Sequence, residues 1–165
     1  MDKIVMMGID PGSHATGYAF LSMAGSKASA LGYGVIRPKK DAELIFRIGH
    51  IIGELEILII KYKPKFFCME KAFFAKNANS ALILGHIRGA IMALGFKHGL
   101  TFSEKSPRSA KQAVTGNGSA SKEQVASMVA RLLGIENLNC ALDASDALAI
   151  ALSGLFLRDL PFALP

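Results

Sequence analysis

Two acidic residues, Asp10 and Glu70, each directly follow a short apolar segment. The segments are Lys3–Ile9 and Lys65–Met69, and their length and apolar composition predict buried β-strands. Proteins of the α/β class bind their ligands at the ends of strands, so both carboxylates stand where an active site would form. Asp10 precedes a Pro-Gly pair and could serve only as a turn residue. Glu70 is harder to explain in that way, because so apolar a strand has no structural need to end in a charge.

Two further acidic residues, Asp143 and Asp146, lie three positions apart in a segment that predicts a final helix, from Asp143 to about Leu157. This spacing puts both carboxylates on one face of the helix. Each has a structural alternative, since Asp143 could cap the helix and Asp146 could be a favourable charge in its first turn.

Carboxylates that converge on one edge of a sheet repel one another unless cations lie between them. Hard oxygen ligands of this kind suit Mg²⁺ or Mn²⁺, which retain several waters and bridge phosphate oxygens. Two such ions about 3.5–4 Å apart can activate a water on one side of a phosphodiester and stabilise the departing oxygen on the other. The set of Asp10, Glu70, Asp143 and Asp146 therefore predicts a metal-dependent hydrolase that acts on phosphodiesters.

The charge of the chain fits a nucleic-acid partner. Its 165 residues carry a net charge of +6, and the stretch from Lys61 to Arg131 holds twelve basic residues against three acidic ones. A basic middle of this kind is typical of proteins that bind polyanions, although a solvated basic surface would look the same. The length predicts a single domain over residues 1–160, with a short tail at 161–165.

Nothing in the sequence predicts a membrane or secretory segment. The most apolar stretch, Ala147–Leu157, is shorter than the roughly 20 residues that span a bilayer, and Asp10 interrupts the apolar start. Cys68 and Cys140 form no Cys-x-x-Cys pair, which favours buried thiols in a reducing cytoplasm.

The apolar patterns predict an α/β domain with three layers. Three strand candidates come first, Lys3–Ile9, Thr16–Leu21 and Ala30–Ile36, and their short connections favour an antiparallel meander. The elements that follow are a helix, a strand, a helix capped by Asn79 or Ser80, a weak strand and three helices: Asp41–Tyr62, Lys65–Met69, Ser80–His98, Leu100–Ser103, a helix from Pro107, Ser121–Leu133 and Asp143–Leu157. This order predicts a mixed five-stranded sheet with helices on both faces.

Three stretches of the chain carry distinctive motifs: Gly8–Ser13 with Thr16–Tyr18, Met69–Asn77 with Ser80, Ala81, Leu84, Gly85, Arg88 and Gly89, and Asp143–Ala151. Together they resemble the motifs of the RuvC family of Holliday-junction resolvases, and the resemblance covers nearly the whole chain. Each motif alone would be weak, whereas all three in order and at suitable separations are specific. His14 departs from the family pattern, in which arginine is frequent, so that a phosphate contact there would depend on pH.

The resemblance implies an RNase H-like fold, a cytoplasmic homodimer, and symmetric nicking of two strands of a four-way junction in DNA recombination and repair. It implies Mg²⁺ as the cofactor, with Mn²⁺ able to substitute and two ions in each site. Carried over by position, Asp10, Glu70, Asp143 and Asp146 are the catalytic and metal-binding residues. The branch-migration proteins RuvA and RuvB are the partners that it implies.

Five further residues are expected to contact DNA. By resemblance, Lys111 and Lys122 match basic positions near the scissile phosphate, where they would offset the charge of the transition state. Phe73 falls where the family places an aromatic that wedges against bases, although an aromatic side chain is more often part of a core. The second motif also contributes Lys76 and Arg88 as expected DNA contacts.

The helix that begins near Ser80 carries small residues at four-residue spacing: Ala81, Gly85, Gly89 and Ala93. Such a stripe lets another helix approach closely, either within the same domain or, as the family dimer implies, across a two-fold axis.

Other functions remain open on the sequence alone. A nuclease with the same fold could act on RNA or on ribosomal RNA precursors. The first motif also resembles the phosphate loop of actin-like and sugar-kinase-like ATPases, but those proteins close two domains around a nucleotide, for which 165 residues are too few. A catalytically silent junction-binding module is the third alternative, and the complete set of four carboxylates disfavours it.

Overall fold

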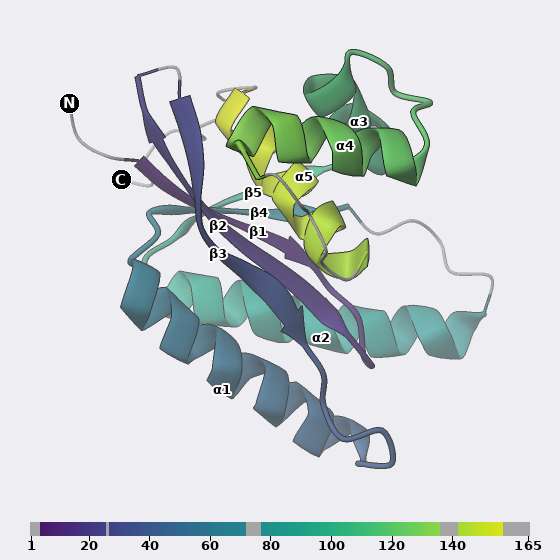
Figure 1. Ribbon diagram of the computed structural model, residues 1–165. Helices are drawn as coiled ribbons and strands as arrows, with labels where there is room; N and C mark the ends of the chain where they lie inside the picture. Colours follow the sequence, from purple (N-terminus) through teal and green to yellow (C-terminus); the bar gives the residue numbers. More distant parts are fainter. Residues whose placement is uncertain (1–3, 26, 72–76, 136–141, 157–165) are drawn as a thin grey trace.

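One mixed sheet organises the molecule (Figure 1). The computed structural model describes residues 4–25, 27–71, 77–135 and 142–156. The sheet has the strand order β3-β2-β1-β4-β5, with the strands β1 Ile4–Asp10, β2 Thr16–Ala24, β3 Lys27–Ile36, β4 Phe66–Glu70 and β5 Thr101–Lys105. The first three strands are antiparallel, and β4 and β5 continue the sheet in parallel with β1. The predicted mixed five-stranded sheet is confirmed.

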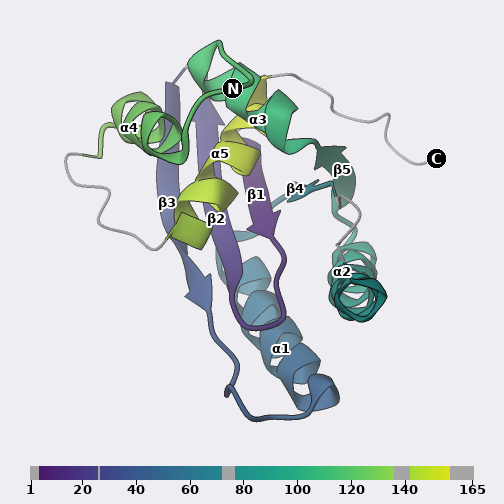
Figure 2. The same cartoon turned by 90° about the vertical axis from the view of Figure 1, so that its right-hand side faces the viewer.

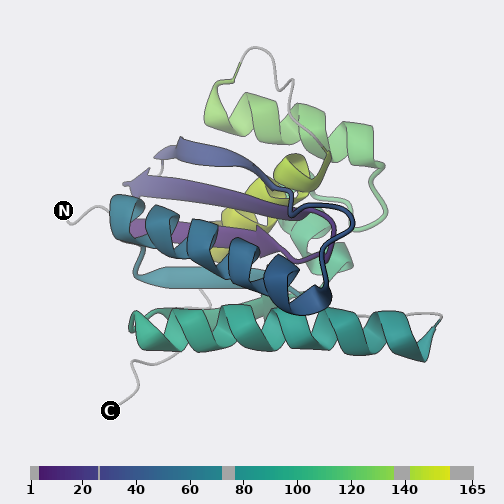
Figure 3. The same ribbon diagram turned by 90° about the horizontal axis from the view of Figure 1, so that it is seen from below.

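Helices cover both faces of the sheet, as the element order predicts (Figure 2). They are α1 Leu44–Tyr62, α2 Ala78–Lys97, α3 Pro107–Thr115, α4 Lys122–Leu133 and α5 Leu142–Phe156. The view from below shows α1 and α2 side by side under the sheet, while α5 crosses the opposite face with α3 and α4 beside it (Figure 3). Two separate groups of buried side chains, one on each face of the sheet, form the core.

The helix α5 lies unusually close to the sheet because of two glycines. A Cβ atom on Gly8 would collide with the carbonyl oxygen of Ala147, and a Cβ atom on Gly17 would collide with that of Asp143. Glycine is therefore required where the backbones of β1 and β2 meet the helix. Gly17 pairs with Asp10 across the β1–β2 ladder, so this contact brings the start of α5 to the end of β1.

The ends of the helices correct two details of the sequence analysis. Asn77 caps α2, with its side chain accepting a hydrogen bond from the main-chain N–H of Asn79, so the expectation of Asn79 or Ser80 as the cap was wrong. The side chain of Asn77 is long enough to bond the second amide beyond it, which starts the helix earlier. Asp143 lies within the first turn of α5, which begins at Leu142, and so is not its cap.

Among the described helices, α2 is the one that is long and apolar enough to cross a membrane by length and composition, with 28% of that stretch buried. The sequence analysis identified no such segment. In the fold, the side of α2 that carries Ile87 and Ile91 packs into the core beneath the sheet.

Candidate active site

The ends of two adjacent strands place the first two carboxylates. Ile9 of β1 is in register with Met69 of β4 in the parallel ladder, so Asp10 and Glu70 occupy the next position on neighbouring strands. Both side chains are half-buried. The apolar residues before them pack in the core and thereby fix the strands whose last residues face the sheet edge.

The helix α5 brings the other two carboxylates to the same edge. Its first turn contacts Gly17 through Asp143, and Gly17 is the ladder partner of Asp10. Asp146, one turn further along, lines a cavity of about 200 Å³ together with Glu70. The four predicted carboxylates therefore gather at one edge of the sheet, from three separate parts of the chain.

The electrostatics of the site reflect this crowding. The pKa of Asp10 is raised to about 7, chiefly by burial and further by repulsion from Glu70, Asp146 and Asp143, while Lys122 opposes the rise. The pKa of Glu70 is also raised, first by burial and then by repulsion from Asp146. Carboxylates whose charged forms are destabilised in this way favour the approach of a cation.

Two lysines from the helices α3 and α4 line the same cavity. Lys122 donates a hydrogen bond to the Asp146 carboxylate at 3.0 Å, which raises the pKa of the lysine. Lys111 donates to the main-chain carbonyl oxygen of Ala120 at 2.7 Å, and its charge partly opposes the rise in the pKa of Glu70. Both cations therefore stand within reach of an anion that enters the cavity.

Arg88 occupies a different position from the one that its predicted role requires. The residue is only 8% exposed, and its guanidinium donates to the main-chain carbonyl oxygen of Glu70 and pairs with the carboxylate of Glu104. It thus ties α2 to the ends of β4 and β5 beneath the acidic cluster. The sequence analysis named Arg88 as a DNA contact and missed this supporting position, because the ion pair joins residues that are sixteen positions apart.

Two predicted DNA contacts, Phe73 and Lys76, lie outside the described residues. Within the described part of the chain, no three His, Cys, Asp or Glu side chains are arranged as a ready metal-binding group. Repulsion from the other carboxylates nevertheless contributes to the raised pKa values of Asp10 and Glu70.

Comparison with known proteins identifies the family of the chain. The family model described as crossover junction endodeoxyribonuclease RuvC matches residues 6–154. A protein of that name from Chlorobaculum parvum is 48% identical over 148 residues, which cover 90% of this chain and 79% of that protein. Another from Pseudoalteromonas atlantica is 45% identical over 90% of this chain and 84% of its own length.

Solved structures show the same fold. Thermus thermophilus RuvC, described in complex with a Holliday junction substrate, superposes with a TM-score of 0.90 at 31% identity and covers 98% of this chain and 99% of its own. The yeast mitochondrial Holliday junction resolvase Ydc2 shares the fold, with a TM-score of 0.66 at 17% identity over 90% of this chain and 76% of its own.

The mixed sheet, with helices on both faces and carboxylates at one edge, defines the class of RNase H-like nucleases. Within that class, the chain belongs to the RuvC family of crossover junction endodeoxyribonucleases, whose members are metal-dependent enzymes.

Proposed function

We propose that this protein is a structure-specific endonuclease that resolves Holliday junctions by Mg²⁺-dependent hydrolysis and nicks two strands symmetrically. The observation that carries the proposal is the convergence of Asp10, Glu70 and Asp146 on one edge of the sheet, in a chain 31% identical to a RuvC described with a Holliday junction substrate. The role in DNA recombination and repair follows from that substrate.

The donor set fits a hard divalent cation. It consists of carboxylate oxygens alone, which suit Mg²⁺ or Mn²⁺ rather than softer metals. Burial and mutual repulsion raise the pKa values of Asp10 and Glu70, and bound cations would offset both effects. When bound, a pair of such ions would supply an activated water and a Lewis acid for the leaving oxygen. Asp10, Glu70, Asp143 and Asp146 are the residues that would hold them.

The protein's own cations have a complementary task. Lys122 and Lys111 line the cavity next to Glu70, where they would hold phosphate oxygens and offset the extra negative charge of the transition state. The bond between Lys122 and Asp146 fixes the ammonium group before substrate arrives. We also propose Phe73 and Lys76 as DNA contacts from the connection that follows β4.

A homodimer through α2 would match the two-fold symmetry of a junction. The stripe of Ala81, Gly85, Gly89 and Ala93 is exposed, and a Cβ atom on either glycine would meet nothing within 4 Å. The alternative that this stripe packs within its own domain therefore has no support. Apolar side chains continue the same exposed surface: Leu82, Met92 and Phe96. We place the dimer in the cytoplasm, with RuvA and RuvB as partners.

The test is a cleavage assay on three substrates of matched length: a mobile four-way DNA junction, a linear duplex and an RNA–DNA hybrid. We expect paired nicks in the junction with Mg²⁺, none with a chelator, and little cutting of the other two. Preferential cutting of the hybrid would favour the alternative nuclease acting on RNA. Tight junction binding without any Mg²⁺-stimulated cut would show a silent binding module instead.

A further inference from the structure

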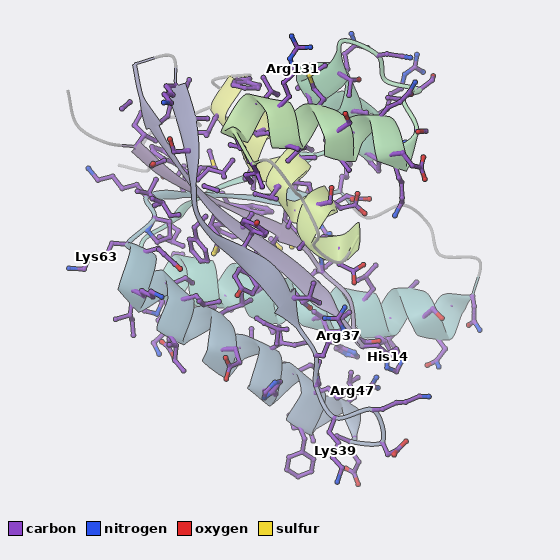
Figure 4. All side chains as sticks on the ribbon, in the orientation of Figure 1. His14, Arg37, Lys39, Arg47, Lys63 and Arg131 are labelled. Carbon is purple, nitrogen blue, oxygen red and sulfur yellow. The ribbon has the colours of Figure 1, made fainter. Side chains whose placement is uncertain are left out.

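A second charged cluster lies at the same end of the sheet as the carboxylates, and it has the opposite sign (Figure 4). We call it the basic corner and define it as His14, Arg37, Lys39 and Arg47. Its residues come from the β1–β2 connection, from the β3–α1 connection and from the first turn of α1. Of these residues, only His14 was considered above as a possible phosphate contact, and the other three lie outside the motifs of the sequence.

The strand register fixes the position of the basic corner. Ile36 pairs with Thr16 at the end of the β2–β3 ladder, so Arg37 comes next to the β1–β2 connection that carries His14. Asp10 pairs with Gly17 at that same end of β2. The basic corner therefore begins four residues beyond the first carboxylate, on the side of β1 away from β4.

Arg47 is held in place at the centre of the corner. Its Nη1 atom lies 3.5 Å from the carbonyl oxygen of Ser13, 3.3 Å from Nδ1 and 3.4 Å from Nε2 of His14. The similar distances to both ring nitrogens place the guanidinium against the imidazole ring. The Nε atom of Arg47 is buried and has no hydrogen-bond partner. This arrangement holds the arginine in place, and because Nε is buried, the donors left for an external acceptor are those of the Nη atoms.

Within the described residues, the cations of the corner outnumber the acidic side chains near them in the chain. The connection from Arg37 to Arg47 carries four basic residues and only two acidic ones, Asp41 and Glu43. In the described part of the chain, no ion pair involves Arg37, Lys39 or Arg47. Arg37 and Lys39 are both exposed. Unpaired cations fixed beside an acidic site attract a polyanion that the carboxylates alone would repel.

We infer that the basic corner is a second phosphate-binding site, which holds the DNA backbone on one side of the scissile phosphate, with Arg47 as its anchor and Arg37 beside it. The inference rests on the proposed function for its choice of DNA as the ligand. A guanidinium fixed by a carbonyl and a ring can still present a pair of N–H groups to a phosphate oxygen pair. The corner would thereby set the register of the strand across the acidic site without reading its sequence.

The test measures how junction binding depends on salt. The variant Arg37→Gln/Arg47→Gln is compared with Lys27→Gln/Lys63→Gln, which removes the same charge at the other end of the hairpin and of α1. Binding of a fluorescent four-way junction and of a linear duplex is followed in chelator over a range of NaCl concentrations. The slope of log K against log[salt] is negative, and each lost phosphate contact reduces its magnitude by about 0.9.

We expect the basic-corner variant to lose about 1–2 units of slope per protomer and about 10–100-fold in affinity at low salt, while the control keeps the wild-type slope. Equal slopes for the two double variants would overturn the inference. If the double variant misfolds, the single variant Arg37→Gln replaces it, because Arg37 is exposed and its loss should not disturb the fold. The magnitude of its salt slope should fall by about one unit, and an unchanged slope would overturn the inference. Failure of the wild type to prefer the junction over the duplex would count against the proposed function instead, since the slope is measured on both DNAs.

Discussion

The two carboxylates on strands and the two on α5 are held in different ways. Asp10 and Glu70 end adjacent parallel strands, and burial is the largest cause of their raised pKa values. Asp146 sits on the helix and already has a cation, Lys122, at 3.0 Å. Nearby cations only partly offset burial and repulsion at the strand pair, whereas Asp146 of the helix pair bonds a lysine directly. A bound cation would act mainly on the strand pair.

The largest expected effect comes from removing a strand carboxylate. Asp10→Asn should lower the rate of junction cleavage at least about 10³-fold, equivalent to about 4 kcal/mol of barrier, because it removes a charge that no neighbour replaces. Junction binding should be retained, since the change reduces repulsion of phosphate. Single-turnover cleavage and binding assays measure the two quantities separately. Asp41→Asn, at an exposed position, is the matched control and should cut normally. Normal cutting by Asp10→Asn would refute the assignment of the site.

The second-largest effect is expected from Arg88, which lies beneath Asp10 and Glu70. Arg88→Met removes a buried cation that bonds the Glu70 carbonyl and pairs with Glu104, so we expect a loss of about 2–4 kcal/mol in the free energy of unfolding. Urea denaturation measures it. Lys97→Met breaks the exposed pair with Glu56 and should cost less than about 1 kcal/mol. Equal losses for the two variants would show that Arg88 does not support the strand ends.

A smaller effect on cleavage is expected from Lys122, the lysine that bonds Asp146 on α5. Lys122→Ala should lower cleavage about 10–100-fold, which corresponds to about 1.4–2.7 kcal/mol, because Lys111 still lines the cavity. Lys122→Arg keeps the charge near Asp146 and should recover part of the activity. Junction cleavage under single-turnover conditions is the measurement. A loss of activity as large as that of Asp10→Asn would contradict the view that the carboxylates on α5 depend less on a bound cation than Asp10 and Glu70 do.

The sequence predicted the parts of this site that depend on local pattern. Apolar runs that end in Asp10 and Glu70 indicated strands, and the three-residue spacing of Asp143 and Asp146 indicated a shared helix face. The sequence pattern did not reveal the position of Arg88 or the basic corner, because both depend on contacts between distant segments. An arginine on an apolar helix looks the same whether it faces DNA or a buried carbonyl. Gly8 and Gly17, which allow α5 to lie close to the sheet, could be recognised from the sequence only as parts of a motif. The requirement for glycine arises because the backbone of α5 approaches them, and the sequence does not show that contact.

The smallest expected effect concerns stability without metal. In the folded protein Asp10 keeps its proton up to a pKa of about 7, whereas the unfolded chain releases it near the ordinary pKa of 3.8, so the folded state binds more protons between these limits. Stability should therefore fall as pH rises from about 4 to about 7, and the loss should be smaller in Asp10→Asn, in which Glu70 keeps a raised pKa but Asp10 no longer contributes. Because Asp10 is only partly buried, we expect about 1–2 kcal/mol for the difference between the two proteins. Urea denaturation of both proteins in chelator at several pH values measures it, and parallel curves would contradict the raised pKa.

Mg²⁺ added at pH 7.5 should restore the stability of the wild type more than that of Asp10→Asn, since only the wild type keeps the charge that the cation would neutralise.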